Sequence, residues 1–272
     1  MLESLFGFKA IMKRPYLMFF WTIIISSVAV LLSLQLPTYS LPIGNSVLDL
    51  RGFFAIIFTI MPPVYFATKY LKKEEALEEK EIQKKYEKHI FARSHSRDII
   101  VFLLYFFGVV VSFTVWSFFL PDTFFQVQEF ELNRVDSSYS VSGFLTREGA
   151  FYSYIQNNMN VMFYSFLIGL LFGAGSIFVL TWNASILSTA ISLKTSTLIG
   201  IPGATAPFLL HGTIEIAGYV LAGLAGSIIS AAVIRGHHRK GVFLKVILDT
   251  GLVFALAAGL IVLGAGVEAF LR

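Results

Sequence analysis

A histidine and a glutamate stand four residues apart at the start of a long apolar run, His211 to Gly236. Positions i and i+4 share one face of an α-helix, so the His211 imidazole and the Glu215 carboxyl group would be neighbours. Ionisable groups inside membrane helices are costly, and they commonly mark ion or proton pathways or pair with one another. The spacing therefore predicts either a buried polar contact that fixes the register of neighbouring helices or a site for transport or proton transfer.

Two further ionisable residues are candidates for the same site. In a predicted helix over 183–203, Lys194 lies about 16 Å from the cytoplasmic start, and Glu215 lies about 13 Å from the outer start of the next helix. Both depths reach the middle of a hydrocarbon core about 30 Å thick. We predict an ion pair between Lys194 and Glu215, with His211 hydrogen-bonded to Glu215 or to Glu268 in the last helix.

Enzyme and metal-site patterns are absent from the sequence. There is no phosphate loop, no H-E-x-x-H and no G-x-S-x-G. The chain has no cysteine, and one histidine with one glutamate supplies too few ligands for the usual zinc geometry. We therefore expect a protein that is not an enzyme and holds no metal or other cofactor.

The composition predicts an integral membrane protein. Hydrophobic residues make up 56% of the 272 residues and charged residues 14%, against about 45–50% and about 25% in soluble domains. The net charge of +4 comes from basic residues between apolar runs, where membrane topology explains them. We expect the lipid bilayer of the cell membrane as the environment, and no nucleic-acid partner.

Six long apolar runs predict the helices that position the candidate residues. A seventh crossing is needed as well, because with six the basic stretch "RGHHRKG" would lie outside the cell, against the positive-inside rule. The short, polar stretch 183–203 is the only candidate for this seventh crossing. We predict an all-α, polytopic transmembrane bundle of about seven spans with a cytoplasmic N-terminus; six spans, with 183–203 re-entrant or interfacial, is the alternative. The other six spans are Tyr16–Leu36, Gly52–Thr68, Ile99–Leu120, Asn160–Thr181, Pro207–Ile234 and Val242–Phe270.

Charge patterning divides the chain into three parts. Residues 1–70 form a predicted N-terminal transmembrane hairpin. Residues 71–98 form a predicted long, charged cytoplasmic helix, which is either a solvated connector or a partner-binding helix. Residues 99–272 form a predicted five-helix membrane domain, in which 121–158 is an acidic outer loop that suits contact with membrane or envelope proteins.

Small residues recur at every fourth position in three of the predicted spans. This spacing lets helix backbones approach closely. We predict close helix packing, either within one chain or between the two copies of a homodimer. The residues concerned are Gly169, Gly173, Gly218, Ala222, Gly226, Gly251 and Gly259.

Three stretches carry a family resemblance: "NNMNVMFYSFLIGLLFGAGSIFVLTWNASIL", "PFLLHGTIEIAGYVLAG" and "AGVEAF". The chain resembles the stage II sporulation protein M family, also described as a domain of unknown function, in its paired asparagines, its G-x-G, its H-G-x-x-E and its final A-x-x-E-A. The resemblance covers Asn157 to Phe270 and extends back to Arg97, but not to residues 1–70. The matching residues are Asn157, Gly173, Gly175, Asn183, His211, Gly212, Glu215 and Glu268.

The chain departs from the family pattern at three positions. Ser176 stands where Thr is usual, Ala184 follows Asn183 where Gly is usual, and Leu210 precedes His211 where Pro is common. The last difference removes a helix-start signal.

The resemblance implies a five-helix core with an outer loop after its first helix. In spore formers the family is similar to a membrane scaffold that holds cell-wall-remodelling proteins during engulfment. We therefore expect a non-enzymatic scaffold that anchors a cell-envelope complex. The alternative is a transporter or channel that uses Lys194, Glu215 and His211 as a polar site at the membrane midplane.

Overall fold

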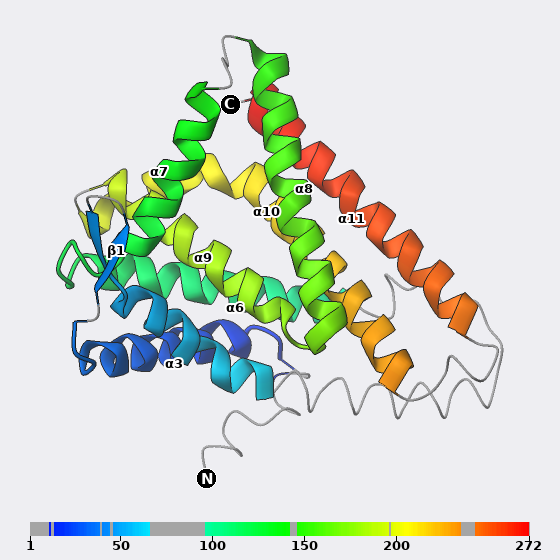
Figure 1. The fold of residues 1–272 in the computed structure, drawn as a ribbon, viewed down its shortest axis with the longest axis horizontal. Coiled ribbons are helices and arrows are strands. Elements are labelled where there is room, and N and C mark those ends of the chain that lie inside the picture. Colours follow the sequence, from blue (N-terminus) through cyan, green and yellow to red (C-terminus); the bar gives the residue numbers. More distant parts are fainter. Residues whose placement is uncertain are drawn as a thin grey trace.

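The computed structural model describes residues 11, 14–38, 40–43, 46–65, 96–141, 146–195, 197–234 and 243–271 (Figure 1). Within these ranges the chain is almost entirely helical. The predicted charged helix 71–98 lies outside them, apart from the three residues that begin α6. The elements are α3 (Leu17–Leu34), β1 (Ser40–Ile43), β2 (Ser46–Asp49), a helix over Arg51–Tyr65, α6 (Ser96–Ser117), α7 (Gln126–Val141), α8 (Arg147–Phe172), α9 (Ser176–Leu193), the 3₁₀ turn η1 (Leu198–Gly200), α10 (Ile201–Ile234) and α11 (Phe243–Leu271).

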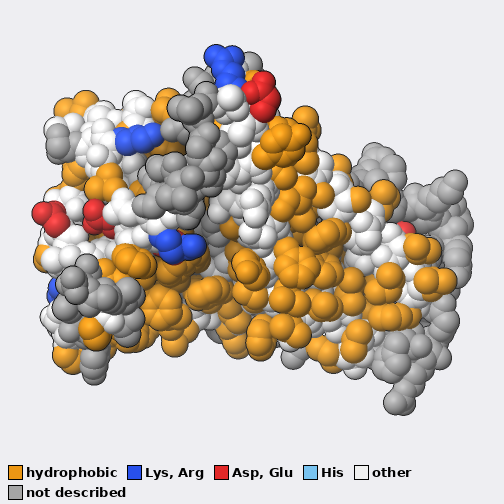
Figure 2. Space-filling model, turned by 45° about the horizontal axis from the view of Figure 1, so that its top comes forward, with side chains coloured by type: hydrophobic (Ala, Val, Ile, Leu, Met, Phe, Trp, Pro, Cys, Tyr) orange, Lys and Arg blue, Asp and Glu red, His pale blue; other side chains and the backbone are white. Residues whose placement is uncertain are grey.

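Within the described residues, five helical stretches are long and apolar enough to cross a membrane: Leu17–Leu34, Ile99–Ser117, Ser176–Leu193, Leu198–Ile234 and Val246–Phe270. The apolar helix Arg51–Tyr65 is shorter. Figure 2 shows hydrophobic side chains over a continuous area of one face, with charged side chains at its margins. Exposed apolar area of this extent does not suit water, so these features indicate a membrane protein.

The all-α prediction missed a small β-hairpin. Strands β1 and β2 pair antiparallel, with Ile43 opposite Ser46, so two residues connect them. Those residues are Gly44 and Asn45, a composition typical of a two-residue hairpin turn. The hairpin lies between α3 and the helix Arg51–Tyr65, within the part of the chain predicted as a plain transmembrane hairpin.

The predicted span Asn160–Thr181 is wrong, because the chain ends one helix and starts another inside this apolar run. Helix α8 ends at Phe172, and Gly173 follows with a φ of 61°, a left-handed conformation that glycine adopts at little cost. Helix α9 then runs from Ser176 to Leu193. The predicted helix 183–203 is therefore the second half of α9, a loop and the start of α10.

Helix α9 is polar in sequence but satisfies its own polar groups. The hydroxyls of Thr181, Ser185, Ser188 and Thr189 are buried, and each donates to a carbonyl oxygen three or four residues earlier. More than half of its apolar window is covered by other elements. A helix whose hydroxyls are satisfied in this way tolerates an apolar setting.

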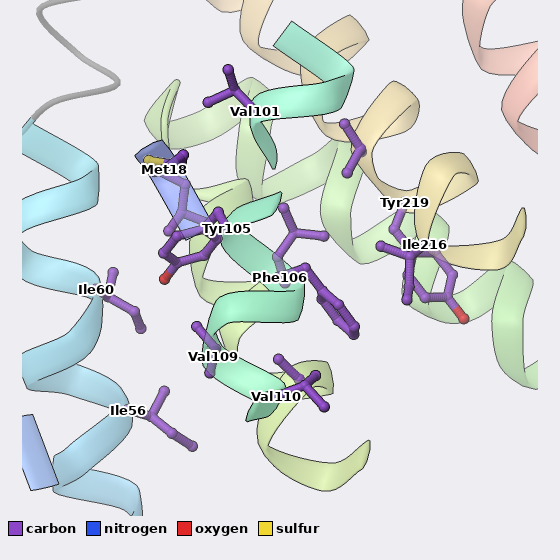
Figure 3. Packing of buried hydrophobic residues seen from close by; sticks show 14 of the residues in the cluster. Met18, Ile56, Ile60, Val101, Tyr105, Phe106, Val109, Val110, Ile216 and Tyr219 are labelled. Atoms are coloured by element: carbon purple, nitrogen blue, oxygen red, sulfur yellow. The ribbon is translucent and has the colours of Figure 1, made fainter. Parts of the chain in front are cut away.

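Two groups of helices share one core. Helix α6 packs on α3 and α9, and α10 packs on α8 and α11. Figure 3 shows Tyr105 and Phe106 of α6 between Ile60 of the preceding helix and Ile216 of α10. The fully buried Tyr105 also shares a hydrogen bond of 2.6 Å with Thr181 Oγ1 of α9. One packed body therefore contains α3, the helix Arg51–Tyr65, α6, α8, α9, α10 and α11.

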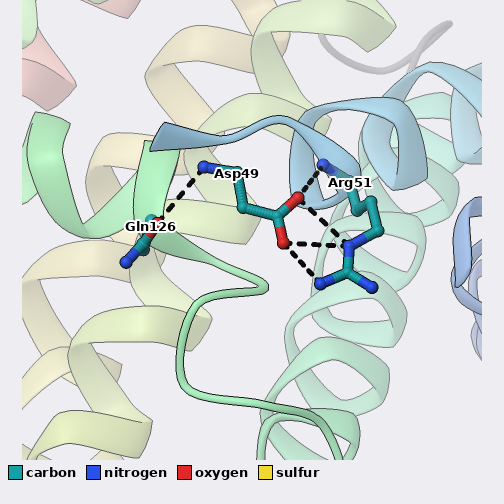
Figure 4. A network of polar contacts seen from close by, with 3 residues as sticks. All are labelled: Asp49, Arg51 and Gln126. Atoms are coloured by element: carbon teal, nitrogen blue, oxygen red, sulfur yellow. Dashed lines mark hydrogen bonds and ion pairs between the residues drawn. The ribbon is translucent and has the colours of Figure 1, made fainter. Parts of the chain in front are cut away.

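A polar network joins β2 to the start of α7 (Figure 4). The Asp49 backbone N–H donates to Gln126 Oε1 at 3.2 Å, and the Asp49 carboxylate accepts from the backbone N–H and the guanidinium of Arg51. Close by, a Cβ on Gly52 would overlap the carbonyl oxygen of Phe124. These contacts fix the β-hairpin against the segment that leads into α7.

Candidate functional site

Three polar side chains of α10 lie at successive i+4 positions on one face. His211 is 5% exposed, Glu215 8% and Tyr219 5%. Helix α10 begins at Ile201 and continues through Pro207, so the predicted start at Pro207 is wrong. The early start gives His211 more than two turns of helix before it. The three side chains therefore project from a continuous helix rather than from its frayed end.

Helix α8 completes the site with Asn158. Its Nδ2 donates to Glu215 Oε1 at 2.6 Å. Its Oδ1 accepts from the Tyr219 hydroxyl at 2.8 Å and from Asn157 Nδ2 at 3.2 Å. Because two donors hold the amide oxygen, the amide nitrogen must face Glu215. The orientation of Asn158 is thus fixed by its neighbours.

Helix α11 contributes a second carboxyl group and a space for the first. Glu268 Oε1 lies 3.6 Å from His211 Nε2, so the second of the two predicted partners lies beside His211 at a distance longer than a hydrogen bond. A Cβ on Gly264 would lie 2.5 Å from Glu215 Cγ, so the Glu215 side chain occupies the space that a side chain at position 264 would need. Near the same end, the Phe151 and Phe270 rings lie 5.7 Å apart and join α8 to α11.

The site lies in the C-terminal third of α11. Gly264 stands seven residues before Leu271, the last residue of α11, and this corresponds to about 10 Å of helix. The predicted midplane depth of Glu215 assumed a helix that started at Pro207. With the earlier start, the carboxyl group faces the C-terminal third of α11 instead.

Lys194 has a different setting from the one predicted. It caps the end of α9, is exposed, and places its ammonium 4.2 Å from the centre of the Phe208 ring. Phe208 precedes Glu215 by two turns, or about 10 Å. This corrects the predicted Lys194–Glu215 ion pair. The depth of Lys194 was counted from a helix start at Asn183, whereas α9 starts at Ser176.

The other predicted polar residues take separate places. Asn157 touches the site only through Asn158. Asn183 donates to the Val179 carbonyl oxygen within α9 at 2.8 Å, and no described contact joins it to the cluster. Asn158 was missed from the sequence, although its spacing to three other buried α8 residues, Met162, Ser165 and Gly169, follows a helical face.

The glycines on the predicted packing faces behave differently from one another. A Cβ on Gly169 would lie 2.5 Å from the Gly223 carbonyl oxygen, and one on Gly218 would lie 2.9 Å from Ile261 Cδ1. A Cβ on Gly226 would overlap the Phe166 carbonyl oxygen, and Ala222 is fully buried. Gly173 forms the turn after α8, and Gly175 precedes α9 against Ile168. By contrast, a Cβ built on Gly212, Gly251 or Gly259 meets no atom of the described residues within 4 Å, apart from its chain neighbours and the backbone of its own helix.

The arrangement offers two kinds of chemistry. It joins three helices through polar contacts away from solvent, and it brings two carboxyl groups and an imidazole together, which are groups able to exchange a proton. Among the described residues, no three His, Cys, Asp or Glu side chains are grouped so as to hold a metal ion.

Comparison with known proteins agrees with the resemblance seen in the sequence. The family model described as Stage II sporulation protein M matches residues 100–271, which is more than half of the chain and includes every residue of the polar site. No curated protein and no solved structure matches.

Proposed function

The chain belongs to the stage II sporulation protein M family, and on that premise we propose that it is a non-enzymatic membrane scaffold that anchors a protein complex at the cell envelope. The observation that supports this role is the construction of the polar site. Asn158 uses its carbonyl oxygen and its amide nitrogen to hold groups of α8 and α10 together. Such contacts favour a fixed framework over a set of helices that slide during transport.

Glycine packing supports the same role. Gly169 of α8 lies directly against the backbone of α10 at Gly223, and Ser165 of α8 donates to the Tyr219 carbonyl oxygen at 2.9 Å. Close backbone approach of this kind strengthens helix association in membranes through dispersion and hydrogen bonding. A firmly packed α8–α10–α11 group would give a partner a constant surface.

Helix α7 is the proposed contact surface. It contacts α9 and β2, and the Asp49–Gln126 hydrogen bond fixes its first residue. Its Arg134 guanidinium donates to both carboxylate oxygens of Glu131, and this hydrogen bonding raises the pKa of Arg134. Phe130 is 38% exposed on the same helix, so an apolar and a charged side chain are both available to an envelope protein.

The proposed topology keeps seven crossings, with the N-terminus in the cytoplasm and α7 outside the cell membrane. Helix α8 and the helix Arg51–Tyr65 would then cross in addition to the five apolar stretches. A homodimer is also proposed, since Gly251 and Gly259 lie exposed along one face of α11 with room beside them. Two copies could bring these faces together as α8 and α10 meet within one chain.

A co-purification experiment tests the scaffold role. The protein would be cross-linked in native membranes and recovered as wild type, as the double variant Phe130→Ala and Arg134→Ala, and as the control Phe20→Ala on the exposed face of α3. We expect an envelope protein to be recovered with wild type and control but lost with the α7 variant, all three eluting as folded protein. Equal recovery from the α7 variant would show that this surface is not the anchor.

A transporter or channel is the second candidate, favoured by the ionisable groups His211, Glu215 and Glu268 between membrane helices. Ionisable groups in such positions often line substrate or proton pathways. Purified protein in liposomes would be assayed for proton and solute flux, with Glu215→Gln as the comparison. Flux that disappears in the variant would favour transport, and its absence in the wild type would favour the scaffold.

A further inference from the structure

We propose that the polar site between α8, α10 and α11 binds one proton, which resides on Glu215 beside the His211–Glu268 pair. This goes beyond the scaffold role and does not depend on it. The same proton would be held in a protein that transports nothing.

The first argument is charge balance among the groups that face the site. Helix α10 contributes His211, Glu215 and the Tyr219 hydroxyl, and α11 contributes Glu268. Helix α8 contributes the neutral amides Asn157 and Asn158. The nearest described ammonium, that of Lys194, lies over the Phe208 ring.

Two buried carboxyl groups lie in this site. Glu215 is 8% exposed, and the side chain of Glu268 is 13% exposed. Neighbouring negative charges repel each other, and an uncompensated charge is costly when it is buried inside a membrane protein. One proton on one of the two carboxyl groups removes this repulsion and one buried charge.

The second argument assigns the proton to Glu215. Glu268 lies beside His211, the only described side chain of the site that can carry a positive charge. Glu215 is hydrogen-bonded instead to the neutral amide of Asn158, whose nitrogen donates to Oε1. Oε1 is therefore the acceptor, and the proton would be carried by the other oxygen of the same carboxyl group.

The third argument concerns access. Glu215 packs on Gly264, and Glu268 lies three residues before the end of α11. Between this site and the helix end stand the Phe151 and Phe270 rings, of which Phe270 is 45% exposed. Glu268 is only about 5 Å of helix from the last residue of α11, so the proposed proton would exchange at this end of the helix.

Infrared spectroscopy of the full-length protein in lipid nanodiscs tests the proposal, because a protonated carboxyl group has its own C=O stretch that shifts in D₂O. We expect wild type to show this band at neutral pH, Glu215→Gln to lose it, and the control Asp249→Asn to keep it. Asp249 is exposed on α11, away from the site. A wild type without the band, or a Glu215→Gln variant that keeps it, would overturn the proposal.

A second variant keeps the test valid if Glu215→Gln fails to fold. Asn158→Ala removes the hydrogen bond to Glu215 Oε1, so we expect the C=O band to remain and to move to a higher wavenumber. An unshifted band in a folded Asn158→Ala protein would also overturn the assignment to Glu215. Neither measurement involves partner recovery, so failure here is distinguishable from failure of the scaffold role.

Discussion

Substituting Gly169 by alanine should separate helices α8 and α10. The new Cβ would lie 2.5 Å from the Gly223 carbonyl oxygen and 3.2 Å from Ser227 Oγ, whereas ordinary contact begins near 3.4 Å. The nearer neighbour is backbone and cannot rotate away, so the helices must move apart by roughly 1 Å, which disturbs close packing along their length. Overpacking of this kind lowers the free energy of unfolding by about 1–3 kcal/mol. The higher helix propensity of alanine raises it by about 1 kcal/mol.

Gly212→Ala is the matched control, because a Cβ at that position of α10 meets nothing within 4 Å among the described residues outside its own stretch of helix. It gains the helix propensity without the overlap. Unfolding of both variants by SDS in mixed micelles, followed by circular dichroism, should give a free energy of unfolding about 1–3 kcal/mol lower for Gly169→Ala than for Gly212→Ala. Equal stability of the two variants would refute the close approach of α8 and α10 described above.

Two further substitutions test the polar networks by the same unfolding measurement. Asn158→Ala removes the donor to Glu215 and the acceptor of the Tyr219 hydroxyl. Loss of a buried hydrogen-bond partner lowers the free energy of unfolding by about 1–3 kcal/mol, and Asn157→Ala should lower it by less. The opposite order would contradict the assignment of Asn158 to the site. Arg51→Ala removes the guanidinium from the Asp49 carboxylate, which is 4% exposed, and should lower the free energy of unfolding by about 1–3 kcal/mol. Arg51→Lys should restore part of this loss. A fully stable Arg51→Ala variant would show that the ion pair does not hold the hairpin.

Much of the site could be predicted from residue type and spacing. His211 and Glu215 share one helix face wherever the helix starts, because their i,i+4 relation depends only on helical geometry. Glu268 is a candidate because it lies near the end of the last predicted span and matches the A-x-x-E-A of the family. The family match over residues 100–271 confirms the resemblance from which Asn157 was selected.

Two helix starts account for the errors in depth. A hydropathy pattern shows a single apolar run from Asn160 to Thr181 and does not reveal a chain reversal within it, yet Gly173 turns the chain with a φ of 61°. The depth of Lys194 is therefore wrong because α9 starts at Ser176, and the depth of Glu215 is wrong because α10 starts at Ile201 and continues through Pro207. Asn158 was missed for a related reason. Which of two adjacent asparagines faces inward depends on the rotation of α8, and that is set by packing on α10.

The most direct test of this account is the membrane topology of the cysteine-free chain. Single cysteines would replace Ser137 in α7, His237 after α10 and Pro202 at the start of α10, and intact cells would be treated with a membrane-impermeant thiol reagent. Seven crossings predict labelling at Ser137→Cys and Pro202→Cys and none at His237→Cys until the cells are opened. Labelling of His237→Cys in intact cells, or none at Ser137→Cys, would contradict the placement of α7 outside and with it the proposed anchoring surface.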